Sequence, residues 1–186
     1  MVRLGVVTDS HIPDRMPRLP PAVFGALAGV DAILHAGDVS ARWVLEALGE
    51  VAPVYAVAGN RDLGLGLPRE RILTFEGVRL GLAHGHGGLW GYLREKALYY
   101  TVGFYHERYL RQVRAYFDDV AVIVFGHSHR PVNRLVEGVL LFNPGSLGPE
   151  YRQPYGPAIG LLTIEGSAVR GEIVPLQPAG KPRPAG

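Results

Sequence analysis

The chain has 186 residues, of which 47% are hydrophobic, and this length and composition suit one domain with a substantial core. Its formal net charge of +2 comes without clusters of Lys and Arg, so nucleic acid is not indicated as a partner. No apolar stretch approaches the roughly 18 residues of a membrane span, and "MVRLGVVTDS" at the N-terminus lacks the cleavage pattern of a signal peptide. We therefore expect a cytoplasmic protein with no membrane contact. The absence of cysteine excludes disulfides and thiolate metal ligands.

The first half of the chain alternates short apolar runs with amphipathic segments. Strands are predicted at "VRLGVVT" (2–8), "DAILHAG" (31–37) and "PVYAVAG" (53–59). Helices are predicted at "PAVFGALAG" (21–29) and "SARWVLEALGE" (40–50), the second with Ser40 as its N-cap. Strands that alternate with helices indicate parallel βαβ units, in which sites form at the carboxyl ends of the strands.

The second half is richer in strands. "RILTFEG" and "VRLGLAHG" predict a hairpin with a turn near Gly77. Further strands are predicted at "VAVIVFG", "PVNRLVEG", "VLLFNPG", "AIGLLTIEG" and "AVRGEIVPL". The pattern predicts an α/β fold of two packed, partly antiparallel sheets with helices outside, in a single domain at residues 1–176. The remaining "QPAGKPRPAG" at 177–186 has the composition of a flexible tail.

Side chains that can bind metal follow five of the predicted strands. They are Asp9 and His11, Asp38, Asn60 and Asp62, His84 and His86, and His127 and His129. Because the carboxyl ends of neighbouring strands lie at one edge of a sheet, we expect these loops to converge on one patch. Each motif alone is a common loop ending, but five of the seven histidines of the chain fall inside these motifs, which favours a functional site.

The residue types of this patch suit divalent metal ions. Carboxylate, imidazole and amide oxygen together can bind Mn, Fe, Zn, Co or Ni, and one Asp can bridge two ions through its two oxygens. Two ions roughly 3.5–4 Å apart can activate a bridging hydroxide while they hold the oxygens of a phosphoryl group. The pattern therefore indicates a pair of divalent ions and the hydrolysis of a phosphoester.

The ordered motifs "DSH", "GD", "GNRD", "HGH" and "GHSH" resemble the signature of the calcineurin-like metallophosphoesterases. Within that superfamily, the short chain, "LHAGD" and "NPGS" are most similar to the YfcE-like small phosphodiesterases, and the resemblance covers residues 2–174. It implies a four-layer αββα sandwich of two mixed sheets flanked by helices, with a dinuclear site at one edge. It also implies two divalent ions, manganese before Fe, Zn, Ni or Co, and attack by a metal-bridging hydroxide on a small organic phosphodiester.

Matched position by position, the resemblance distributes seven ligands over two ions. The first ion would be held by Asp9, His11 and His129, the second by Asn60, His84 and His127, and Asp38 would bridge them. Of the two histidines in "HGH", His84 matches the ligand and His86 would lie beside the substrate. The two histidines of "HSH" can serve two ions from one loop, since residues two apart in an extended segment point to the same side.

One position departs from the family's pattern. Many relatives have a histidine that contacts the phosphate or protonates the leaving group where this chain has Arg61. Arginine stays protonated, so Arg61 would clamp the phosphate without acting as a general acid, which favours good leaving groups. His86 is either the substitute proton donor or a solvent-facing residue without a catalytic role. Asp62 is expected to position the Asn60 loop rather than to bind metal.

The remaining polar candidates are expected to be structural. His35 ends a predicted strand, where a hydrogen-bonded structural histidine is expected, and His106 is expected to be an ordinary helix residue. The stretch "NPGS" at 143–146 is expected to be a turn held by Pro144 and Gly145.

Residues 89–117 form a tyrosine-rich segment between two ligand motifs. An apolar stripe at helical spacing runs through Leu93, Ala97, Tyr100, Phe104, Tyr105, Tyr109, Val113 and Tyr116. The stripe predicts one long helix or a kinked pair. We expect this insert to pack in the core or to form a homo-oligomer contact, with an aromatic cap over the site as the alternative.

Two other functional classes stay open. The same fold occurs in the retromer's phosphoesterase-like subunit, which works through protein contacts, so a catalytically weak scaffold is the alternative to an enzyme. That relative lacks the histidine of the first motif, whereas this chain has His11 and the other expected ligands, which favours an enzyme. A metal-dependent nuclease is disfavoured because no basic groove is indicated.

Overall fold

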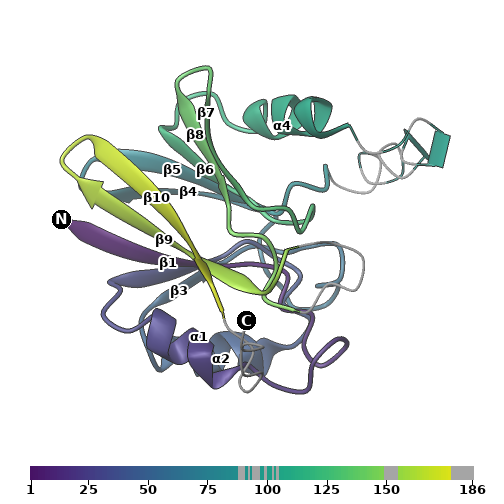
Figure 1. The fold of residues 1–186 in the computed structure, drawn as a ribbon, viewed down its shortest axis with the longest axis vertical. Helices are drawn as coiled ribbons and strands as arrows, with labels where there is room; N and C mark the ends of the chain where they lie inside the picture. The colour runs from purple at the N-terminus through teal and green to yellow at the C-terminus, as the bar shows by residue number, and fades with distance from the viewer. Residues whose placement is uncertain are drawn as a thin grey trace, which may run out of the picture.

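Two five-stranded β-sheets pack face to face, and helices cover their outer faces, so that the fold has four layers (Figure 1). The computed structural model describes residues 1–87, 91, 93, 97–98, 100–101, 103, 105–148 and 155–176. The predicted tail at 177–186 lies outside these described residues, as do many residues between 89 and 104 in the predicted insert at 89–117. The described part confirms the predicted αββα sandwich of two mixed sheets.

The first sheet combines the N-terminal βαβ strands with a C-terminal hairpin. Its order is β10 (Ala168–Pro175), β9 (Ala158–Glu165), β1 (Val2–Val7), β2 (Ala32–His35) and β3 (Val54–Ala56). β1, β2 and β3 are parallel, whereas β9 runs antiparallel to both β1 and β10. The predicted parallel arrangement of the N-terminal strands is therefore confirmed.

The second sheet has three parallel strands between two antiparallel edge strands. Its order is β4 (Glu70–Phe75), β5 (Val78–Ala83), β6 (Val122–Val124), β8 (Val139–Asn143) and β7 (Val132–Val136). The β4–β5 and β7–β8 hairpins turn through Glu76–Gly77 and Glu137–Gly138, where all four φ angles are positive. Such two-residue turns match the right-handed twist of the paired strands, and the first of them confirms the hairpin predicted near Gly77.

Helices α1 (Pro21–Ala26) and α2 (Arg42–Gly49) lie on the outer face of the first sheet, and α4 (His106–Arg114) lies on that of the second (Figure 1). The prediction of Ser40 as the N-cap of α2 is wrong. The cap is Ala41, which makes no side-chain capping bond. Ser40 has a φ of 68°, and its N–H donates to Asp62 Oδ1 at 2.8 Å, so it belongs to the loop before the helix.

Three apolar clusters join the four layers. Leu4 and Val6 point into the cluster between the sheets, whereas the neighbouring Val7 points into the cluster under α1 and α2, as the alternation of a strand requires. The third cluster lies between the second sheet and α4, and it buries Tyr109 and Val113. Tyr109 and Val113 of the predicted apolar stripe therefore pack in the core, as expected, whereas Tyr105 is 56% exposed.

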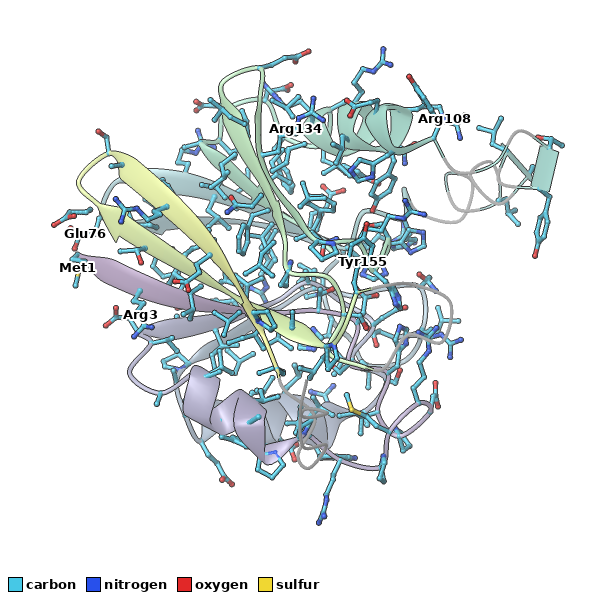
Figure 2. The ribbon with its side chains drawn as sticks, in the orientation of Figure 1. Met1, Arg3, Glu76, Arg108, Arg134 and Tyr155 are labelled. Atoms are coloured by element: carbon cyan, nitrogen blue, oxygen red, sulfur yellow. The ribbon has the colours of Figure 1, made fainter. Side chains whose placement is uncertain are left out.

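The two ends of the sandwich differ. At one end the N-terminal ammonium lies 3.6 Å from Glu76 Oε2, so an ion pair joins the two sheets there. Figure 2 shows Met1, Arg3 and Glu76 together at this end, with Tyr155 toward the other. At that other end lie the loops that follow the parallel strands, together with the candidate ligands. Within the described ranges, no helix is long and apolar enough to cross a membrane.

Candidate metal centre

The loops after β1, β2 and β3 meet those after β5 and β6. The His127 N–H donates to Asp9 Oδ2 at 3.0 Å, and His84 Nδ1 donates to the Ala36 carbonyl at 2.7 Å, so hydrogen bonds join the two sheets here. Because a carbonyl oxygen can only accept, the Nδ1 atom of His84 carries the proton, and in the neutral ring the Nε2 lone pair faces the site. The predicted convergence of the loops is confirmed.

Asp9, His11 and His129 form a first group, whose ligand atoms all lie within 4.8 Å of one another. Asp9 Oδ1 is 3.1 Å from His129 Nε2 and 3.7 Å from His11 Nε2, and the two imidazole rings stack with centroids 5.1 Å apart. Asp9 is fully buried, and in the described part of the chain its Oδ1 atom accepts no hydrogen bond. Such a buried oxygen is costly, and a cation among these three side chains would remove that cost.

Asn60, His84 and His127 form a second group. Asn60 Oδ1 lies 3.2 Å from His84 Nε2 and 3.1 Å from His127 Nδ1. The Asn60 side-chain oxygen thus faces one nitrogen of each imidazole. One oxygen and two imidazole nitrogens that converge at these distances are atoms that can bind one cation together. The donor atoms of this group therefore fit a metal ion.

Asp38 lies between the two groups. Its Oδ2 atom is 3.7 Å from His11 Nε2, and its Oδ1 atom is 3.6 Å from His84 Nε2. Asp9, Asp38 and His84 also have ligand atoms within 4.8 Å of one another. Each Asp38 oxygen thus faces a different group, which is the arrangement that a carboxylate shared by two cations needs.

Burial controls protonation in this site. It lowers the pKa of His11 and of His127 to about 3 each, so both imidazoles are neutral and can offer a lone pair at neutral pH. Burial by itself would raise the pKa of Asp9, but the neighbouring His129, His84 and His11 together outweigh it and hold that pKa well below its usual range. Burial raises the pKa of Asp38. Two carboxylates and neutral imidazoles held out of water favour the binding of a cation.

The candidate ligands have an uncommon backbone. The φ angle is positive at Asp9 (52°), His11 (50°), Asp38 (53°), His127 (65°) and His129 (54°). Residues other than glycine rarely adopt this conformation, and it clusters at functional sites, where the surrounding structure holds it in place. The strain distinguishes these loops from ordinary strand endings.

Glycines lie next to the ligands because a larger side chain would not fit. A Cβ atom at Gly59 would overlap Asp38. One at Gly126 would overlap Thr8 and lie 2.7 Å from Asp9 Oδ2. The glycines of "GN" and "GH" are therefore required by the close approach of the neighbouring strand-end loop.

The two histidines outside the motifs are structural, as predicted. The Gly37 N–H donates to His35 Nδ1 at 3.3 Å, so His35 Nε2 carries the proton and donates to Ser10 Oγ at 2.6 Å. His35 is fully buried, and burial lowers its pKa. His106 is the first residue of α4.

Asp62 holds two loops of the site together. Its Oδ2 atom accepts a hydrogen bond from the Gly59 N–H at 2.7 Å, and its Oδ1 atom accepts one from the Ser40 N–H at 2.8 Å. The loop that carries Asn60 is therefore tied to the loop that follows Asp38. This confirms the predicted positioning role of Asp62.

The sequence did not identify several residues that support the ligands. Thr8 Oγ1 donates to Asp9 Oδ2 at 2.7 Å, and Arg15 Nη1 lies 3.4 Å from His129 Nδ1. Ser146 Oγ donates to the Asp9 carbonyl at 3.2 Å, so the predicted "NPGS" turn also contacts the site. Thr8 directly precedes Asp9 in the sequence, and this position could have indicated a hydroxyl that supports the Asp9 carboxylate. Ser146 is 137 positions away from Asp9, and no local pattern could indicate that contact.

Arg61 and His86 border the ligand groups. The Arg61 backbone N–H donates to Asp38 Oδ1 at 2.9 Å, while its guanidinium pairs with Asp14 at 2.9 Å. His86 is half-buried and, with Asn60, lines a cavity of about 620 Å³. Burial lowers the pKa of His86 to about 4. His86 therefore faces a space that a substrate bound at the second group could enter.

Comparisons with known proteins agree with this architecture. The sequence profile described as the calcineurin-like phosphoesterase superfamily domain matches residues 2–167. A protein named as a probable metallophosphoesterase from Methanothermobacter thermautotrophicus is 36% identical over 173 residues, which cover 92% of this chain and 91% of that protein.

Solved structures share the fold. Vacuolar Protein Sorting 29 from Cryptosporidium parvum has a TM-score of 0.76 at 21% identity, over 95% of this chain and 92% of that one. A structure described as a novel archaeal phosphodiesterase has a TM-score of 0.63 at 19% identity, over 93% and 100% of the two chains. At these identities the likeness concerns the fold alone. The profile match, the relative at 36% identity and the two ligand groups together show that the chain belongs to the calcineurin-like phosphoesterase superfamily, a family of metal-binding hydrolases.

Proposed function

We propose that this protein is a phosphodiesterase that hydrolyses a small organic phosphodiester at a centre of two divalent ions. The observation that carries the proposal is the position of Asp38, whose two oxygens face His11 at 3.7 Å and His84 at 3.6 Å. Membership of the superfamily supports the hydrolysis of a phosphoester. A protein of the same fold is described as an archaeal phosphodiesterase, so this fold can carry the hydrolysis of a diester.

The proposed ligands are those that the sequence motifs assign. They are Asp9, His11 and His129 for the first ion, Asn60, His84 and His127 for the second, and Asp38 for both. Carboxylate, imidazole and amide oxygen together suit manganese, our first choice, and also Fe, Zn, Ni or Co. The Asp9 Oδ1 atom, which accepts no hydrogen bond among the described residues, supports this assignment, as does the convergence of Asn60 Oδ1 with His84 Nε2 and His127 Nδ1.

Two bound divalent ions would supply a hydroxide nucleophile at neutral pH and positive charge beside the phosphoryl oxygens. Side chains of the protein would bind the phosphate and contact the substrate. Arg61 lies beside Asp38, to which its backbone N–H donates, and its half-exposed guanidinium, paired here with Asp14, is the candidate clamp for the phosphate. His86 lines the adjoining cavity with Asn60 and can contact the substrate there, but its pKa of about 4 leaves it neutral at neutral pH, which disfavours it as the proton donor.

The second candidate function is a protein-binding scaffold. It is favoured by the fold shared with Vacuolar Protein Sorting 29, at a TM-score of 0.76. The complete set of candidate ligands in this chain favours the enzyme. A homo-oligomer contact through residues 89–117 and a cytoplasmic location are further proposals that rest on the sequence alone.

The proposed activity is tested by hydrolysis of bis(p-nitrophenyl) phosphate. Metal-stripped protein is reconstituted in turn with Mn, Ni, Co, Fe and Zn, and bound metal is counted by mass spectrometry. We expect metal-dependent release of p-nitrophenol by the wild type. Asp38→Asn should abolish turnover and lower the occupancy of both ions, because it removes the shared carboxylate.

The matched control is Asp118→Asn, an exposed carboxylate away from the ligand groups, which should behave like the wild type. Full activity in Asp38→Asn would contradict the dinuclear mechanism. A folded wild-type protein that binds two ions and hydrolyses nothing with any metal would favour the scaffold.

A further inference from the structure

A cavity of about 620 Å³ adjoins the second ligand group and has walls of two kinds. Asn60 and His86 form the wall toward the ligands, and Leu63, Leu67 and Arg69 lie farther along it. A smaller cavity of about 200 Å³, also lined by His86 and Arg69, continues past them. The space next to the proposed reaction centre therefore offers both apolar surface and a cation to whatever occupies it.

The loop that forms the apolar wall is held in place. The Ala58 N–H donates to the Pro68 carbonyl at 2.8 Å, which closes the loop at its base. Leu65 and Leu67 pack against the apolar cluster under α1 and α2. Leu63 is the exception, because 93% of its surface is exposed. Because Leu63 also lines the cavity, an apolar or ring group bound there would cover part of this exposed side chain.

Arg69 is the available cation of this cavity. The other arginines near this loop have protein partners. Arg61 pairs with Asp14 at 2.9 Å, Arg71 Nε donates to the Ala56 carbonyl at 3.0 Å, and Arg42 donates to the Leu65 carbonyl. Among the described residues, the exposed Arg69 side chain makes neither an ion pair nor a hydrogen bond. A guanidinium that lines a ligand-sized cavity without a protein partner is suited to bind an anion.

We propose that this cavity binds the organic group of the substrate and that Arg69 binds a second anionic group on it. The substrate would then be a phosphodiester whose organic part has an apolar or ring surface, which contacts Leu63, and carries a further phosphate or carboxylate. This inference rests on the proposed phosphodiesterase function, which places the scissile phosphate at the neighbouring ligand groups. A phosphodiester whose organic groups carry no charge would leave Arg69 unused.

The test compares two chromogenic substrates, the p-nitrophenyl ester of thymidine 5′-phosphate and the same ester with an added 3′-phosphate. We expect the wild type to prefer the second in kcat/KM by about tenfold, as a charge-assisted hydrogen bond allows. Arg69→Gln should remove the preference, whereas Arg170→Gln, an exposed arginine on β10, should keep it. Equal kcat/KM values for the two esters with the wild type, or an unchanged preference in Arg69→Gln, would overturn the proposal.

A binding measurement separates this proposal from the phosphodiesterase proposal. Calorimetry with Mn-loaded protein compares thymidine 3′,5′-bisphosphate with thymidine 5′-phosphate, and needs no turnover. The bisphosphate should bind about tenfold more tightly to the wild type, and Arg69→Gln should lose that difference. If the difference persists in Arg69→Gln, the anion site is wrong even where bis(p-nitrophenyl) phosphate is hydrolysed. If it is lost but no ester is hydrolysed, the site stands and the hydrolytic function fails.

Discussion

The Arg61 guanidinium pairs with the Asp14 carboxylate at 2.9 Å, while the Arg61 backbone N–H donates to Asp38 Oδ1 at the same distance. Arg61 thus joins the loop after β1 to the carboxylate between the two ligand groups. Both partners of the ion pair are about half exposed, so a phosphate can compete with Asp14 for the guanidinium. Asp14 is therefore expected to moderate the affinity of Arg61 for the substrate.

Replacing Arg61 should raise KM, and replacing Asp14 should lower it. Arg61→Ala is expected to raise KM for bis(p-nitrophenyl) phosphate by about tenfold with a smaller effect on kcat, since it removes a phosphate contact. Asp14→Asn is expected to lower KM, because the guanidinium loses its competitor. Steady-state kinetics with Arg170→Ala as the control measures both effects, and an unchanged KM in Arg61→Ala would remove its role as a clamp.

Gly59 should tolerate no side chain. In Gly59→Ala the new Cβ atom would overlap Asp38, so we expect loss of bound metal and of turnover, together with a lower melting temperature. Gly25→Ala in α1 is the matched control, because a Cβ there meets nothing within 4 Å. The control should be as stable as the wild type or more stable by up to about 1 kcal/mol. Normal metal content in Gly59→Ala would show that the loops can move apart.

Thr8 should affect metal affinity through Asp9. Its hydroxyl donates to Asp9 Oδ2 at 2.7 Å and so orients the other oxygen toward the ligand group. Thr8→Val keeps the shape and removes the hydrogen bond, and we expect metal affinity to fall about tenfold. Competition with a fluorescent chelator measures the affinity, with Thr163→Val on β9 as the control. Equal affinities in both variants would limit Thr8 to packing.

The metal-free protein should lose stability as pH falls below 6.5. His11 and His127 have pKa values of about 3 in the folded state against an ordinary value of 6.5. Between those values the unfolded state binds more protons, so acid favours unfolding, and above pH 6.5 the effect is absent. Each of the two histidines should cost roughly 1.4 kcal/mol per pH unit inside this window.

Urea unfolding of chelator-treated protein from about pH 7 to about pH 5 measures this slope. His127→Gln should flatten it, which is a comparison of slopes and does not depend on the absolute stability of the variant. Asp38 changes the free energy of unfolding in the opposite direction. Because its pKa is raised in the folded state, the folded state binds that proton at a higher pH than the unfolded state does. A free energy of unfolding that is constant over this range would contradict the assigned pKa values.

The sequence predicted the features that follow from local pattern. Apolar runs predicted the strands of both sheets. The motifs that contain glycine and the candidate ligands identified the loops that meet at one end of the sandwich. Ser40 shows where local pattern failed: a serine before a helix predicts a cap, but its N–H is bonded to Asp62 from a distant loop. The Arg61–Asp14 pair and the cavity at Arg69 likewise depend on segments brought together only by packing.

The first ligand group also matters for how the chain is held together. His11 and His129 are 118 positions apart in the chain, yet their Nε2 atoms lie 3.3 Å from each other. An ion bound by both would close a loop of that length, which restricts the unfolded chain much as a long-range disulfide does. In a chain without cysteine, the proposed catalytic metal would thus also act as a reversible cross-link between the two sheets, and chelation should loosen the sandwich.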